Sequence, residues 1–181
     1  MRIAKATLSS RWAWSSGLAL GVFAILALLD LRLKALTGVG TADLAGFSSA
    51  AQFRAAFWAW SPEPYAVRAG FNLGFDYLLM PLYAASFFYS GVLSAEAYAP
   101  GAGRLRRLLL AAAMVPLIGA LCDAAENALQ LSMLMNGAND GAAGLASAAS
   151  NAKIIALIVG LALLAGALMA RFTKRALRTA K

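Results

Sequence analysis

A polar stripe interrupts the most apolar part of the chain at residues 123–130. Its members, spaced at i, i+3, i+4 and i+7, are Asp123, Glu126, Asn127 and Gln130. On a helix these positions share one face, which must turn toward other helices rather than lipid. Carboxyl and amide groups arranged in this way can bind a cation or the charged head of an amphiphile. Paired carboxyls can also serve as the acid and the base of an enzyme.

A second polar set begins the apolar run at residues 71–94. Asn72, Asp76 and Tyr83 fall on one helical face, and Tyr77 follows Asp76. Lys153, near the start of the last apolar run, is the one cation placed to pair with these carboxyls. The predicted ligand-binding residues are therefore Asn72, Asp76, Tyr77, Tyr83, Asp123, Glu126, Asn127 and Lys153. No catalytic residue and no metal-ligand set is assigned.

The elements that must position these residues are membrane spans. Of the 181 residues, 61% are hydrophobic and 13% are charged, and the mean hydropathy is +0.70. Soluble domains carry roughly 25% charged residues, so this composition is that of an integral membrane protein. Four apolar runs are each long enough to cross a bilayer, at about 12–33, 71–94, 108–134 and 151–172. They predict an all-α, integral membrane four-helix bundle that forms a single polytopic domain.

The residue types that are missing exclude several chemistries. With no histidine anywhere in the sequence, the usual zinc, haem and Ser-His-Asp sites lose their commonest residue. Cys122 is the one cysteine, so no intramolecular disulfide can form, and we expect it to be an inert buried thiol. No cofactor is expected.

The basic residues predict the orientation of the chain. The net charge is +8, but eleven of the sixteen Lys and Arg residues lie in three short blocks that flank apolar runs, without aromatic interleaving, so nucleic acid is not an expected partner. The positive-inside rule places these blocks, and both termini, in the cytoplasm. The alanine and arginine usage suits a high-GC bacterium, which favours a multi-pass protein of the bacterial inner membrane. The blocks are Arg2, Lys5 and Arg11; Arg104, Arg106 and Arg107; and Arg171, Lys174, Arg175, Arg178 and Lys181.

This orientation brings the polar residues to a common depth. At 1.5 Å per residue, Asp76 and Asp123 both lie roughly 8 Å below the outer boundary of a core about 30 Å thick. Carboxyls from separate spans therefore converge in the outer third of the bilayer. An isolated charge there is costly, so we expect the group to be paired, hydrated or protonated.

Two loops are predicted on the outer side. Residues 34–70 contain an aromatic segment in which Ser48 or Ser49 could cap a short helix that Pro62 and Pro64 would end. We expect an amphipathic interfacial helix there, with its aromatic side toward the membrane, and the alternative is a plain loop with an aromatic belt. Residues 136–151 are expected to be a loop rich in small residues. Within the spans, pairs such as Gly17 and Gly21, or Ala156 and Gly160, have helix-packing spacing.

Three segments resemble a known pattern: GFDYLLMPLY at 74–83, DAAEN at 123–127 and AKIIALIVGLALL at 152–164. They are similar to small, uncharacterised bacterial four-span inner-membrane proteins, which have an Asp-aromatic pair opening the second span, D-x-x-E-N in the third and a lysine opening the fourth. The resemblance covers residues 50–172 and brings no activity with it. A looser similarity is to the four-span sterol-isomerase and sigma-2-receptor group, whose ligand cavity uses acidic residues; the matching motifs are not present here. The first resemblance implies signature positions Asp76, Tyr77, Asp123, Glu126, Asn127 and Lys153.

Three functions fit these residues. The first is binding or transport of a cation or an amphiphilic small molecule at the acidic cluster. The second is a structural or accessory role, in which the cluster joins helices. The third is a lipid- or isoprenoid-modifying enzyme with paired carboxyls, a class the missing motifs weigh against. The expected partners are the lipid bilayer, a cation, lipid or small-molecule ligand, and either further copies of the chain or another membrane protein.

Overall fold

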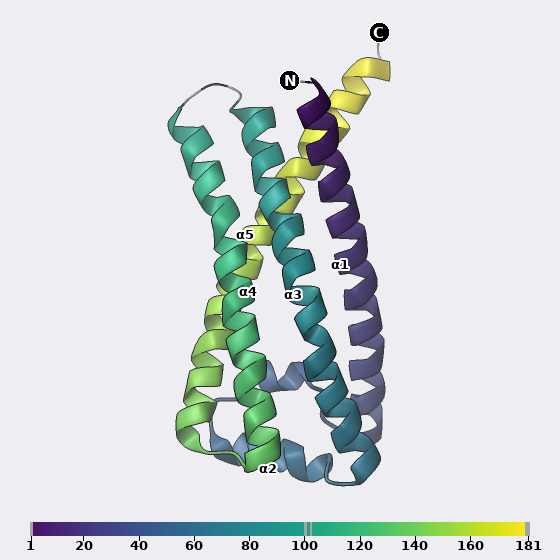
Figure 1. Ribbon diagram of the computed structural model, residues 1–181, viewed down its shortest axis with the longest axis vertical. Helices are drawn as coiled ribbons and strands as arrows, with labels where there is room; N and C mark the ends of the chain where they lie inside the picture. The colour runs from purple at the N-terminus through teal and green to yellow at the C-terminus, as the bar shows by residue number, and fades with distance from the viewer. Residues whose placement is uncertain (1, 100, 102, 180–181) are drawn as a thin grey trace. The chain divides into compact units, whose positions relative to one another are not determined.

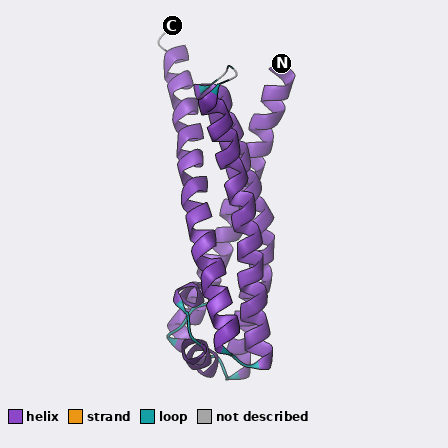
Figure 2. Cartoon of the chain, turned by 90° about the vertical axis from the view of Figure 1, so that its left-hand side faces the viewer, coloured by secondary structure: helices purple, strands orange, loops and turns teal. Residues whose placement is uncertain are grey.

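The computed structural model describes residues 2–99, 101 and 103–179, and the side chains of residues 7–99, 101 and 103–172. The described residues form helices and connecting turns and contain no β-strand (Figures 1 and 2). The helices are α1 (Arg2–Thr37), the 3-10 helix η1 (Ala42–Gly46), α2 (Ala50–Ala59), α3 (Glu63–Tyr98), α4 (Arg104–Asn136) and α5 (Asp140–Thr179). Four of them, α1, α3, α4 and α5, are long and apolar enough to cross a membrane. The predicted all-α fold with four spans is therefore confirmed.

Each long helix contains its predicted span and extends beyond it at both ends. The loop predicted over residues 136–151 is mostly wrong, because α5 already begins at Asp140. Alanine, the strongest helix former, dominates this stretch, and the Asn139 side chain accepts a hydrogen bond of 2.9 Å from the backbone N–H of Ala142. Gly38 (φ 82°) and Gly137 (φ 90°) end α1 and α4 in the left-handed conformation that glycine adopts most easily.

The chain divides into two compact units. Unit 1 comprises Met1–Ala19, Pro81–Ala120 and Ile154–Lys181, and unit 2 comprises Leu20–Met80 and Leu121–Lys153. Every long helix contributes a segment to each unit, so α1 and α4 run from unit 1 into unit 2, and α3 and α5 run back. All three predicted basic blocks belong to unit 1. Of their residues, Arg2, Lys5, Lys174, Arg175, Arg178 and Lys181 lie outside the described side chains.

In unit 2, η1 and α2 run across the ends of the long helices (Figure 1). Phe53 and Trp60 are fully buried there, in a core shared with Leu33, Leu73 and Met133. The predicted short helix is confirmed, but its aromatic face contacts protein where lipid was expected. The ends of α1, α3 and α4 are themselves apolar, so they can cover an aromatic face as well as lipid can. The outward aromatic side chain is that of Trp58, which is 80% exposed.

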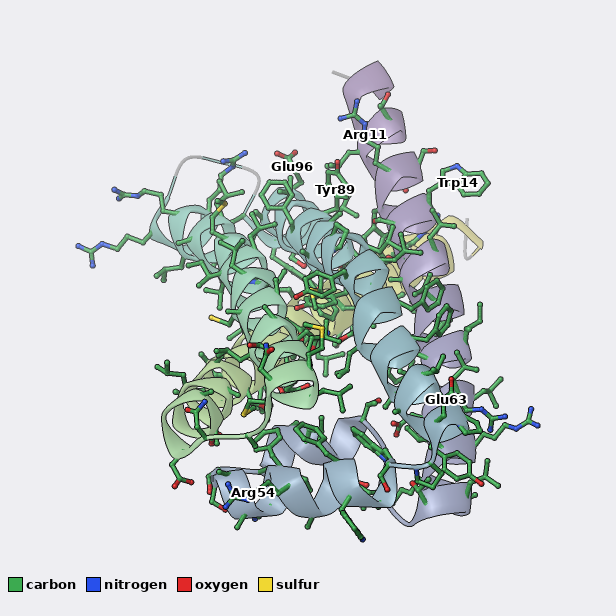
Figure 3. All side chains as sticks on the ribbon, turned by 60° about the horizontal axis from the view of Figure 1, so that its bottom comes forward. Arg11, Trp14, Arg54, Glu63, Tyr89 and Glu96 are labelled. Carbon is green, nitrogen blue, oxygen red and sulfur yellow. The ribbon has the colours of Figure 1, made fainter. Side chains whose placement is uncertain are left out.

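Polar contacts hold α2 at its N-terminal end. Ser49 is the N-cap residue, and the Gln52 side chain accepts hydrogen bonds from the backbone N–H groups of Ser48 and Ser49. The Ala50 N–H donates to a carboxylate oxygen of Asp140 at 2.8 Å. Arg54, labelled in Figure 3, donates to the carbonyl of Ala138 at 3.1 Å. These contacts tie α2 to the turn between α4 and α5.

In unit 1, neutral polar groups join α1 to α3. The indole N–H of Trp12 donates to the hydroxyl of Ser90 at 2.8 Å, and the hydroxyls of Ser16 and Ser86 lie 2.7 Å apart. Ser90 in turn donates to the carbonyl of Ser86 at 2.8 Å. Trp14, on the same helix as Trp12, is by contrast 71% exposed and points outward from α1 (Figure 3).

Small residues permit close helix contacts in the same unit. A Cβ added at Gly91 would lie 2.5 Å from the Cβ of Ala113, and one added at Gly160 would overlap the ring of Phe87. Gly160, from one of the predicted packing pairs, is therefore a true close-contact position. Gly17 behaves differently, because a Cβ added there would meet nothing within 4 Å.

Candidate functional site

The carboxyl cluster lies in unit 2, where α3, α4 and α5 contribute side chains to one buried group. Asp123, Glu126 and Asn127 all come from α4 and are buried, and Glu126 is only 1% exposed. The helical spacing of the stripe explains this arrangement, because one face of α4 carries every one of these side chains inward. Lys153 reaches them from α5 and Asp76 from α3.

Lys153 joins two of the carboxylates. Its Nζ lies 3.0 Å from Oδ1 of Asp123 and 2.5 Å from Oε2 of Glu126, and its side chain is 16% exposed. The Gln130 amide donates to Oε1 of Glu126 at 2.9 Å. We call these four residues the Lys153 cluster. The sequence left the pairing of Lys153 open, and the structure brings its ammonium between the two carboxylates.

Asp76 has a different kind of partner. The Asn127 side-chain amide donates to Oδ2 of Asp76 at 2.9 Å and to the carbonyl of Leu73 at 3.2 Å. The Tyr77 hydroxyl donates to the carbonyl of Ala124 at 2.9 Å, and Tyr77 is 38% exposed. Asp76 is partly buried, so it is less enclosed than the carboxylates of α4. These bonds join α3 to α4 through neutral donors.

The remaining predicted residues lie in different places. Asn72 is buried one helical turn before Asp76, in unit 2. Tyr83 belongs to unit 1, where its ring is buried and lies 6.0 Å from that of Phe87. All the predicted ligand-binding residues except Tyr83 thus belong to unit 2.

Three contacts of the site were missed in the sequence set. Gln130 was recognised on the polar stripe but not assigned, although its position seven residues after Asp123 places it on the same face. The carbonyls of Leu73 and Ala124 also accept side-chain hydrogen bonds. No sequence signal identifies such carbonyls, because every residue has one.

The charges of the site do not balance. Asp76, Asp123 and Glu126 supply three carboxyls, whereas Lys153 is the one ammonium within ion-pair distance of any of them among the described side chains. Burying an uncompensated charge is costly, and in a membrane it is costlier still because water is scarce. The site can lower this cost by binding protons or by binding a cation.

The donor set limits what that cation would be. Among the described residues, no group of three His, Cys, Asp or Glu side chains is placed to hold a metal ion. The space between Asp123 and Glu126 already contains the Lys153 ammonium. Cys122, next to Asp123 in sequence, is a free and partly buried thiol.

The fold and the site together define a class: an α-helical chain with four candidate membrane spans and a buried group of carboxylates that share one lysine. No protein-family model, no curated protein and no solved structure matches the chain.

Proposed function

We propose that unit 2 binds a monovalent cation, or the cationic head of an amphiphile, at Asp76, and that the Lys153 cluster is the rigid frame of this site. The observation that carries the proposal is the excess of two carboxyls over ammonium groups in one buried group. We further propose that the protein lies in a bacterial inner membrane with both termini in the cytoplasm. The site then faces the outer leaflet, and the gathering of all the basic blocks in unit 1 supports this orientation.

Asp76 is the natural acceptor for an external cation. Asp123 and Glu126 already share the ammonium of Lys153, so a new cation would have to compete with a covalently tethered one. Asp76 accepts a hydrogen bond from the Asn127 amide, which orients the carboxylate without neutralising its charge. One carboxylate supported by amide and carbonyl oxygens suits an organic ammonium or a monovalent ion better than a divalent metal.

The structural role is the second candidate, and it is favoured for a different part of the site. Lys153 joins α5 to α4, and the Asn127 and Tyr77 bonds join α4 to α3. The Lys153 cluster therefore fixes helices whether or not a ligand binds. The paired-carboxyl enzyme stays a prediction from sequence, since Asp123 and Glu126 both hold the ammonium of Lys153. The likeness to bacterial four-span proteins likewise stays a proposal.

The test compares the purified wild type with Asp76→Asn in a neutral detergent. Thermal unfolding is followed by tryptophan fluorescence with octylammonium, with octanol at equal concentration, and with Na⁺ or K⁺ salts. At about ten times its Kd, a cation that binds the folded state should raise the Tm of the wild type by about 3–5 °C. Asp76→Asn should lose this shift while keeping the hydrogen bond to Asn127 in amide form.

The matched control is Glu63→Gln, which removes an exposed carboxylate from the first turn of the same helix and should keep the full shift. A cation-induced rise in Tm that survives Asp76→Asn would contradict the proposal, and so would the absence of any rise in the wild type. If the site is only structural, Asp76→Asn, Asp123→Asn and Glu126→Gln should all lower the Tm, and no cation should change it.

A further inference from the structure

An open groove in unit 1 lies between α1, α3 and α5. Its walls include Ser9 and Trp12 from α1, Leu93 and Ala97 from α3, and Ala167 and Arg171 from α5. The groove holds about 130 Å³. A water molecule in the liquid takes roughly 30 Å³, so the groove can admit a polyatomic group such as a phosphate ester.

Arg171 and Trp12 form the polar end of this groove. The guanidinium carbon of Arg171 lies 5.2 Å from the ring centroid of Trp12, which is a cation–π contact. Trp12 is itself fixed by its hydrogen bond to Ser90. Arg171 is also exposed, and the N–H edge of a guanidinium matches two oxygens of a phosphate.

The charge around the groove favours an anion. Unit 1 contains eleven of the sixteen basic residues and one of the eight acidic residues, Glu96. Glu96 pairs with Arg106 at 3.1 Å, and none of the described carboxylates lies within ion-pair distance of Arg171. Arg171 is exposed, and no described carboxylate neutralises its guanidinium.

The limits of the predicted spans place the groove at a membrane boundary. Trp12 begins the first predicted span, Leu93 lies at the end of the second, and Arg171 lies at the end of the fourth. Tryptophan and arginine at span ends are typical of the headgroup level of a bilayer, and basic pockets between spans bind anionic headgroups. From this level Leu93 and Ala167 continue the apolar wall toward the hydrocarbon.

We propose that this groove binds one anionic phospholipid, with the phosphate at the Arg171 guanidinium edge and the Ser9 hydroxyl, and the first part of an acyl chain along Leu93 and Ala167. The site is independent of the cation proposed for unit 2. A membrane lipid fits the groove better than a soluble phosphate does, because most of the lining residues are apolar and add binding free energy only for a ligand with a hydrocarbon part.

Lipid retention by the purified full chain tests the proposal. The protein is exchanged into mixed micelles with equal mole fractions of phosphatidylglycerol and phosphatidylcholine that have identical acyl chains, and native mass spectrometry counts the lipids retained. The wild type should retain phosphatidylglycerol in preference, and Arg171→Gln should reduce this preference about fivefold. Arg107→Gln removes an exposed arginine of the same unit outside the groove and should leave the preference unchanged.

Several outcomes would overturn the proposal. Equal retention of the two lipids by the wild type, or an equal loss in Arg171→Gln and Arg107→Gln, would show that no specific anion site exists at Arg171. Displacement of the lipid by inorganic phosphate, but not by chloride at the same ionic strength, would assign the groove to a free anion. If Arg171→Gln does not fold, Arg171→Lys takes its place: it keeps the charge but not the planar edge, so a preference equal to that of wild type would contradict the proposed phosphate contact.

Discussion

Unit 1 and unit 2 are built from successive segments of the same four long helices, yet they join those segments by different means. In unit 1 the buried interhelical contacts use hydroxyls, an indole and close approach at Gly91 and Gly160. The ion pair between Arg106 and Glu96 in the same unit is partly exposed. In unit 2 three carboxyls and an ammonium are drawn into the interior. Packing and neutral hydrogen bonds carry little desolvation cost, whereas buried ions carry a large one. The described contacts of unit 1 therefore join these helices without fully buried ions, and the buried ions of unit 2 call for a role beyond association.

The largest expected effect comes from removing the one ammonium of the carboxyl site. Lys153→Met keeps an unbranched side chain but leaves Asp123 and Glu126 buried without a counter-charge, which should cost about 3–5 kcal/mol of unfolding free energy. Chemical unfolding in detergent, followed by circular dichroism, measures it. If Lys153→Met is as stable as the wild type, the stability of unit 2 does not depend on its buried ion pairs, and the two units do not differ in this respect.

The matched control is Lys34→Met, since Lys34 forms a 2.7 Å ion pair with Asp43 but its side chain is half exposed. Water solvates Asp43 when this pair is lost, so stability should change little. A double variant, Lys153→Met with Glu126→Gln, should recover part of the lost stability because it removes one of the two stranded charges.

The next variant tests whether close packing of the helices stabilises unit 1. Gly91→Ala introduces a methyl group against Ala113, and overpacking of this kind typically costs about 1–3 kcal/mol. Gly17→Ala is the control in the same unit, because its added methyl group meets nothing within 4 Å and should stabilise the helix by roughly 0.5–1 kcal/mol. Thermal unfolding of the two variants should shift in opposite directions. A shift of the same sign in both would mean that unit 1 does not depend on close packing at Gly91.

A smaller loss is expected from the neutral hydrogen bonds of unit 1. Ser90→Ala removes the acceptor of the Trp12 indole N–H and should lower stability by about 0.6–1.5 kcal/mol, the range for an interhelical bond in a membrane protein. The near-ultraviolet circular dichroism of tryptophan reports directly on the loss. A loss of stability as large as that of Lys153→Met would show that neutral hydrogen bonds contribute as much stability as the buried ion pairs.

The smallest effect concerns the exposed ion pair of unit 2. The hydrogen bond from Lys34 lowers the pKa of Asp43 below its usual value. The stabilisation is therefore complete above the pKa of Asp in the unfolded chain, and it is lost as the pH falls through the lower pKa of the folded protein. Asp43→Asn should remove this small acid-induced loss, and high salt should weaken it in the wild type. An unchanged profile of stability against pH in Asp43→Asn would contradict the assignment.

The depth of the polar side chains along the spans could be predicted from the sequence. The direction in which each side chain points around its helix could not. Because each helical residue rises 1.5 Å, counting along the spans was enough to group Asp76 with Asp123 and Lys153. The direction in which Lys153 points around α5 depends on how an alanine-rich helix packs, and alanine marks no preferred face. The structure supplies this direction. It also shows that Asp76 accepts a hydrogen bond from Asn127, whereas Asp123 and Glu126 are ion-paired with Lys153.

The two segments predicted on the outer side show where the hydrophobic pattern alone is ambiguous. The sequence pattern of α2 is the same whether its aromatic face contacts lipid or the apolar ends of neighbouring helices. The pattern therefore predicts the helix but not what covers its aromatic face. Residues 140–151 are small and weakly polar, which resembles a loop by composition. Their alanine content favours helix, and the Asn139 cap starts it earlier than expected.

The ties between α2 and the turn before α5 have a consequence for the order in which the protein assembles. Ala50 and Arg54 bond to Asp140 and Ala138, and Ser150 bonds to the carbonyl of Ala45. The partners in these three bonds are separated by 84 to 105 residues. During synthesis the segment around α2 is thus made well before its partners, so these three bonds can form together only after Ser150 has been made. Their formation is therefore a late step in the folding of unit 2.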